Sequence, residues 1–164
     1  MSDSHTLTPG YRLNSEKIRR ALYRLAAAVM SFDRLGRSGA PLEELREGFA
    51  DDELAHLLVE TALANRLQLE HMLQLREDAS ELRFQPFTET CGVWEWEDDH
   101  PAAKPLDFRE ASNKIIHADE ISLVCVEPET LYLKGRHAKS EWKVTIPIQA
   151  YIETSIKNFE DALG

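Results

Sequence analysis

The chain has 164 residues, of which 43% are hydrophobic and 29% are charged, a balance that predicts one packed domain and excludes wholesale disorder. Its net charge of −10 argues against a broad nucleic-acid-binding surface, which is normally basic. No apolar run approaches the roughly 20 residues that span a bilayer, and no secretory signal is visible at the N-terminus, so we expect no membrane association and a cytoplasmic location.

The first predicted elements are a polar arm and a helix. Residues 1–13 are expected to form a flexible N-terminal arm, and Asn14 or Ser15 can cap the helix that follows. Apolar residues then recur at steps of three and four over residues 15–34, which predicts an amphipathic helix. They are Ile18, Leu22, Leu25, Val29 and Phe32. Gly36 and Gly39 are expected to end this helix.

A short helix is predicted over residues 41–50 and a long one over residues 52–77. Asp51 and Asp52 are placed at the start of the long helix, where acidic side chains complement the helix dipole. Its wide apolar face is expected to pack against the helix at 15–34 as an antiparallel pair.

The region 82–105 is the least regular part, with two proline-bounded loops around an aromatic core. Val93, Trp94 and Trp96 are interpreted as a short extended piece. A helix follows at 106–118, with Asp107 near its first turn.

Beyond residue 120 the periodicity changes from helical to alternating. The segments "EISLVCVEPE", "TLYLKGRH" and "SEWKVTIPI" predict three strands of an antiparallel meander, at about 121–147. A last helix is predicted from Ile148 onward. The expected fold class is therefore mainly α (α+β): an antiparallel helical bundle at 14–164, with a three-stranded meander inserted before the C-terminal helix.

The predicted helix "FREASNKIIHADEI" carries Arg109, Asn113 and His117 at steps of four, and such residues share a helix face. This motif and the helical layout resemble the HEPN superfamily, which consists of small helical bundles, many of them metal-independent ribonucleases of toxin–antitoxin and abortive-infection systems. The family signature is an Arg followed, on the same late helix, by a His. By this resemblance, Arg109 and His117 are the signature pair, and Ser112 stands where a closer arginine is common.

The resemblance implies metal-independent endoribonuclease activity in a defence or stress role, with Arg109, Asn113 and His117 as catalytic residues and no cofactor or metal. A His can exchange protons with the RNA oxygens, and an Arg can stabilise the charge that builds on the phosphate. Lys114, Lys134 and Arg136 are predicted to bind the substrate. The family usually forms homodimers that gather both motifs into one cleft, so we expect a homodimer.

Helix geometry places Arg109 and His117 roughly 12 Å apart along the axis. Asn113 can fill this gap, or Arg109 can meet His117 of a second chain. A structural alternative stays open, in which His117 completes the end of its helix and Arg109 pairs with Asp107 or Glu110.

A rival interpretation is an inactive HEPN-like interaction or structural protein that binds a partner protein or nucleic acid. Residues 1–100 hold 11 Lys and Arg against 19 Asp and Glu, whereas residues 101–164 hold 8 against 10. The acidic first part would then dock a basic partner. The charge around His117 distinguishes the two interpretations, because a nuclease needs a positive cleft there and a docking protein does not.

The acidic run near Trp96 and the two cysteines are not predicted to form a functional site. The run "WEWEDDH" offers oxygen ligands for a divalent cation, but a charge run in a loop is usually just solvated. Cys91 and Cys125 form no CxxC pattern and are expected to be reduced, structural thiols.

Overall fold

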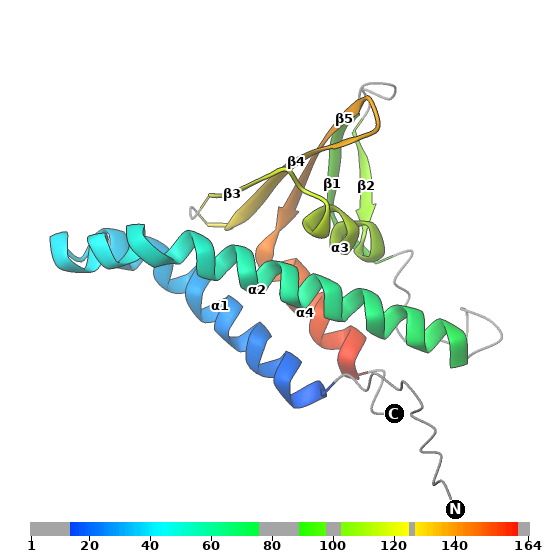
Figure 1. Cartoon of the computed structure of the whole chain (residues 1–164), viewed down its shortest axis with the longest axis horizontal. Coiled ribbons are helices and arrows are strands. Elements are labelled where there is room, and N and C mark those ends of the chain that lie inside the picture. The colour runs from blue at the N-terminus through cyan, green and yellow to red at the C-terminus, as the bar shows by residue number, and fades with distance from the viewer. Residues whose placement is uncertain (1–13, 76–88, 98–102, 125–126, 161–164) are drawn as a thin grey trace, which may run out of the picture.

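The computed structural model describes residues 14–75, 89–97, 103–124 and 127–160. These residues form helices and strands in the order α1 (Ser15–Gly36), α2 (Ala40–Leu75), β1 (Thr90–Glu97), β2 (Lys104–Asp107), α3 (Phe108–Ile116), β3 (Glu120–Val124), β4 (Thr130–His137), β5 (Ser140–Pro147) and α4 (Ile148–Glu160). Helices α1, α2 and α4 lie together, and the sheet rises from them with α3 packed at its base (Figure 1).

Helix α1 forms as its apolar periodicity predicts. The side chain of Asn14 accepts a hydrogen bond from the backbone N–H of Lys17 at 3.2 Å, which caps the first turn. Ile18, Leu22 and Leu25 are buried on the face that packs toward α2 and α4. The predicted capping residue and the predicted buried face are both confirmed.

Helix α2 is continuous where two helices were predicted. It begins at Ala40 and runs through the predicted boundary at residues 50 and 51 without a break. Its one proline, Pro41, lies in the first turn, where proline is tolerated, and one exposed helical glycine, Gly48, costs only about 1 kcal/mol relative to alanine. Asp51 and Asp52 therefore lie inside a long helix, where they cannot complement the dipole of a first turn.

The predicted fold class was wrong in its β part. The described strands form one five-stranded antiparallel sheet in the order β2-β1-β5-β4-β3, and not a three-stranded meander. Strands β1 and β2 precede α3 in the chain and the other three strands follow it, so the sheet combines segments from before and after that helix. The coarser statement that the fold is α+β holds.

The three C-terminal strands were located correctly, and their alternation explains why. Leu131 and Leu133 of β4 are buried, as are Trp142, Val144 and Ile146 of β5, while the residues between them are exposed or half-buried. One face of the sheet therefore packs against the helices and the other faces outward.

Strand β2 was not predicted, because it is short and shows no alternation of apolar and polar residues. Its sequence is "KPLD", and a proline in such a run argues against a central strand. The predicted helix at 106–118 was accordingly too long, because Leu106 and Asp107 belong to β2 and the helix begins at Phe108.

A buried polar network joins α2 to α4. The side-chain amide of Asn65 donates to the Tyr151 hydroxyl at 3.1 Å and to the Ser155 hydroxyl at 2.8 Å. The Asn158 amide donates to the Asn65 side-chain oxygen at 3.1 Å. Because a buried amide without partners is costly, this network holds the two helices in one register.

The predicted arm at 1–13, the run Asp98 to His100, Cys125 and residues 161–164 lie outside the described residues. Within the described part of the chain, no helix combines the length and the apolar content needed to cross a membrane.

Candidate functional site: the edge of helix α3 and the groove beneath strand β3

Helix α3 starts where Asp107 ends β2. The Asp107 carboxylate accepts a hydrogen bond from the backbone N–H of Glu110 at 2.8 Å, the geometry of a helix N-cap. Phe108, Ala111 and Ile115 are buried against the core. The helix is therefore held by its cap and by one apolar face, and its opposite edge carries the predicted catalytic residues.

Arg109 and His117 are both exposed, at the two ends of this edge. His117 is the C-cap residue of α3, and its backbone N–H donates to the Asn113 carbonyl at 3.0 Å. The structure thus places His117 in the position that the structural alternative requires. Exposure at both ends also leaves each side chain accessible to a ligand.

Asn113 does not bridge these two ends. Its side-chain amide donates to Glu110 at 3.1 Å, so it is engaged within its own helix. Its side-chain oxygen is buried without a hydrogen-bond partner among the described residues. Ser112 is completely buried, so this position faces the core, and the arginine common there in the family signature would have to point into the interior.

Lys114 is engaged by aromatic rings. Its Nζ lies 4.0 Å from the ring centroid of Trp94 and 4.2 Å from that of Trp142. The Nζ of Lys104 also lies over Trp94, at 4.4 Å. Such cation–π contacts stabilise the packing of α3 on the inner face of the sheet.

Lys134 and Arg136, the other predicted substrate-binding residues, point to the outer face of the sheet. They occupy the exposed positions of β4 that alternate with buried residues. Lys134 pairs with Glu120 and Arg136 pairs with Asp119, each at 3.6 Å. The sheet therefore separates them from Lys114, and the structure does not bring the three cations together.

The hollow over β4 and β5 has balanced charge. Its charged lining residues are three acidic and three basic side chains: Asp119, Glu120, Glu141, Lys134, Arg136 and Lys143. A nuclease requires a positive surface for the phosphate backbone, and this hollow supplies no excess positive charge.

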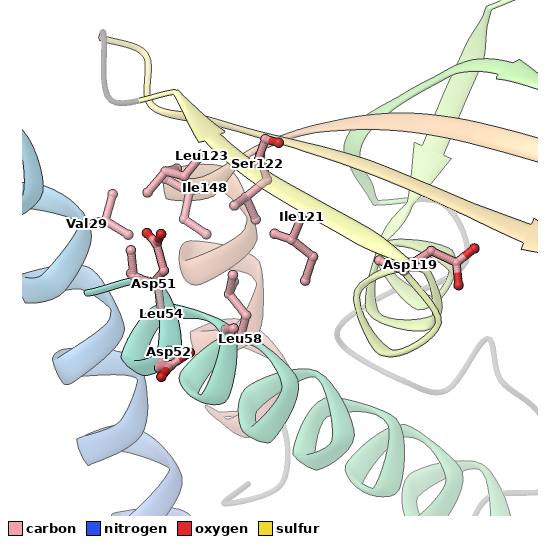
Figure 2. Close-up of a pocket in the computed structure, with 13 residues that line it drawn as sticks. Val29, Asp51, Asp52, Leu54, Leu58, Asp119, Ile121, Ser122, Leu123 and Ile148 are labelled. Carbon is pink, nitrogen blue, oxygen red and sulfur yellow. The ribbon is translucent and has the colours of Figure 1, made fainter. Parts of the chain in front are cut away.

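A larger groove, of about 550 Å³, lies between β3 and the helices. Apolar side chains from five elements line it: Val29 of α1, Leu54 and Leu58 of α2, Ile121 and Leu123 of β3, Leu131 of β4, and Ile148 of α4. Figure 2 shows Ile121 pointing down from β3 toward α2 and Leu58 pointing up from α2. The groove thus runs alongside the strand, and its surface is shared about equally between apolar and polar groups.

Among the described residues that line this groove, only acidic side chains carry a formal charge. They are Asp51, Asp52 and Asp119. Asp119 points away from the groove in Figure 2 and pairs with Arg136. Asp51 points from α2 toward the β3 side, and neither Asp51 nor Asp52 forms an ion pair with any described residue.

The groove was not recognised in the sequence. Asp51 and Asp52 were interpreted as helix-start charges, and Ile121 and Leu123 as ordinary strand residues. Their alternation with exposed neighbours signalled a buried face, but nothing in the sequence signalled that part of this face stays open.

No metal centre or reactive thiol is found in the described part of the chain. It contains no group of three His, Cys, Asp or Glu side chains that could hold a metal ion. Cys91 is buried, and this burial raises the pKa of its thiol to about 12. Such a thiol is protonated at neutral pH and is not a nucleophile.

The site is thus defined by its own geometry: an exposed Arg and His at the ends of α3, and a groove that presents apolar side chains beside acidic ones. No protein-family model, no curated protein and no solved structure matches this chain.

Proposed function

We propose that this protein is a non-catalytic interaction protein, which binds a basic and apolar segment of a partner protein in the groove beneath β3. The observation that carries the proposal is the groove itself, which presents Ile121 and Leu123 of β3 beside the acidic side chains Asp51 and Asp52 of α2. It corresponds to the docking function considered for the acidic first part of the chain.

Both parts of the groove favour such a partner. Filling it would remove the half-buried side chains Ile121 and Leu123 from water, and apolar burial contributes about 25 cal/mol per Å². Asp51 and Asp52 have no cation beside them in the described chain, so a partner's Lys or Arg would add complementary charge. An RNA phosphate, by contrast, would be repelled by the same carboxylates.

The test uses a fluorescent peptide about ten residues long in which lysine alternates with valine, titrated with the full chain by anisotropy. We expect saturable binding with a Kd below about 100 µM. Asp51→Asn combined with Asp52→Asn should weaken it at least about tenfold, which corresponds to about 1.4 kcal/mol.

The matched control is Glu44→Gln combined with Glu47→Gln, which removes two exposed charges of α2 outside the groove. This variant should bind like the wild type, and a peptide with glutamate in place of lysine should not bind. Absence of binding up to about 1 mM peptide, or equal weakening by both double variants, would overturn the proposal.

A second candidate, metal-independent RNA cleavage, is favoured by the exposure of both Arg109 and His117 on one helix and by the resemblance of this motif to the HEPN superfamily. The two side chains are separated by the length of α3, so the arrangement requires a homodimer in which Arg109 faces His117 of a second chain. Lys114 is held over Trp rings and would contribute little to substrate binding.

For this candidate, His117→Ala should abolish cleavage of a tRNA pool in the presence of EDTA while the melting temperature changes little. The matched control is His137→Ala, because His137 is also exposed but lies at the end of β4. A wild-type protein that leaves both tRNA and single-stranded RNA intact would eliminate catalysis.

A further inference from the structure

Strand β3 is the last strand of the sheet on one side. It pairs with β4 in an unbroken antiparallel register from Glu120 to Val124, and no described strand pairs with its other edge. Alternate backbone N–H and C=O groups of an edge strand point outward, where they are available to another chain.

This edge lies along the groove. Ile121 and Leu123, two residues apart on β3, both line it, and so do Leu54 and Leu58, one helical turn apart on α2. A chain laid beside β3 would therefore have backbone partners on one side and apolar side chains beneath it (Figure 2).

The edge of β3 favours an extended chain over a helix, because the outward-pointing backbone groups of an edge strand pair with another strand. An extended chain inserts only every second side chain and keeps its backbone at the rim.

We propose that the partner binds as an added strand on β3, an inference that rests on the proposed function of the groove. The partner segment is extended, with apolar side chains at alternate positions facing Ile121, Leu123 and Leu58. A Lys or Arg at the end of the segment, beyond the residues that pair with β3, lies near Asp51 and Asp52. Main-chain hydrogen bonds supply affinity, and the groove selects the side chains.

The test compares the lysine–valine peptide with two versions that carry N-methyl groups, one on every valine amide and the other on every lysine amide. In an added strand, the N–H groups of alternate residues face β3 and the others face solvent. One methylated version should therefore lose binding at least about tenfold, while the other should stay within about twofold of the parent peptide.

The outcomes separate the two proposals. If both methylated peptides bind like the parent, or if both fail while the parent binds, strand addition is overturned and docking in the groove stands. If the parent peptide does not bind, the proposed function itself fails. A homodimer that is abolished by Leu123→Lys would make a second copy of this chain the occupant, which would also overturn the inference.

Hydrogen exchange supplies an independent readout. Peptide binding should slow the exchange of alternate amides of β3 and leave the amides of β2 unchanged, because β2 is the opposite edge of the sheet. Uniform slowing along β3, or none, would contradict an added strand.

Discussion

The two edges of the sheet are built differently. Strand β2 has four residues, carries Lys104 and Pro105 at exposed positions, and pairs with a strand whose register shifts between Thr90 and Gly92. Strand β3 pairs in regular register, contains neither lysine nor proline, and presents Ile121 and Leu123 to a groove.

Short length, lysine, proline and bulges are the devices that keep a sheet edge from pairing with other chains. The β2 edge carries all four, whereas the β3 edge is one residue longer and has no lysine, proline or bulge. Among the described residues, one edge is thus protected and the other is open for pairing, which supports a binding role for β3.

The largest expected effect on stability comes from Gly92→Ala in β1, the strand that pairs with the protected edge strand β2. A Cβ at this position would lie 2.4 Å from the Thr145 backbone oxygen, so β1 would have to move away from β5. Such overpacking should cost about 3 kcal/mol and lower the melting temperature by roughly 10 °C, measured by calorimetry. Gly48→Ala, which meets nothing within 4 Å, should instead raise it slightly.

The next largest effect on stability is expected when a lysine, of the kind that protects the β2 edge, is introduced into β3. Leu123→Lys replaces a half-buried side chain, so we expect a loss of about 1.5 kcal/mol in a denaturant titration. Peptide binding should disappear, because a charge then occupies the groove. Retained binding would show that the peptide does not use this edge. Leu63→Lys, at an exposed position of α2 outside the groove, controls for the change of charge.

The junction between β2 and α3 should respond to the loss of its cap. Asp107→Ala removes the acceptor of the Glu110 N–H and should cost about 1 kcal/mol. Asp107→Asn keeps an acceptor and should cost less than half of that. Urea titrations of both variants at neutral pH test this order, which would be contradicted if the two variants were equally stable.

The Asp107→Asn variant also tests how the stability of the protein depends on pH. Burial raises the pKa of the Asp107 carboxyl, although the hydrogen bond from the Glu110 backbone opposes the rise. The folded state then binds the proton more tightly, so this carboxyl contributes stability below about pH 4 that is lost as the pH rises through its folded pKa. Relative to the wild type, Asp107→Asn should therefore gain stability with rising pH across that window.

The smallest effect on stability is expected when the lysine and the proline of the β2 edge are replaced. Lys104→Thr combined with Pro105→Val removes the cation–π contact with Trp94, which is worth about 0.5 kcal/mol at an exposed site. It also restores a backbone N–H at the edge, so sedimentation should show more self-association than the wild type does at the same concentration. A variant that sediments like the wild type would mean that these residues do not protect the edge.

Much of the secondary structure was predictable because its causes are local. The apolar spacing of Ile18, Leu22 and Leu25 predicts α1, and the alternation through Leu131 and Leu133 predicts β4. Asp107 was correctly placed near the start of α3 for the same reason, since a cap acts on the next three residues.

The candidate site was only partly predictable. The sequence placed Arg109 and His117 on one helix, whereas in the structure α3 ends at Ile116 and His117 is its C-cap residue; their catalytic role stays a prediction. The position of Lys114 over Trp94 and Trp142 depends on how α3 packs on the sheet, and no local pattern reports this. Lys134 and Arg136 were grouped with Lys114 by charge, whereas the strand alternation in the folded sheet places them on its other face.

By itself, the sequence determined the helix at 15–34, the three strands after residue 120 and the acidic net charge, because each depends on residues near one another in the chain. Only the tertiary structure decided that β1 and β2 join those strands in one sheet, and that the edge of β3 stands over α2. Strand pairing and groove formation depend on contacts between segments that are distant in the chain; Leu58 and Ile121, for example, line the same groove. These contacts are selected by the packing of the whole chain and not by the preferences of any one segment.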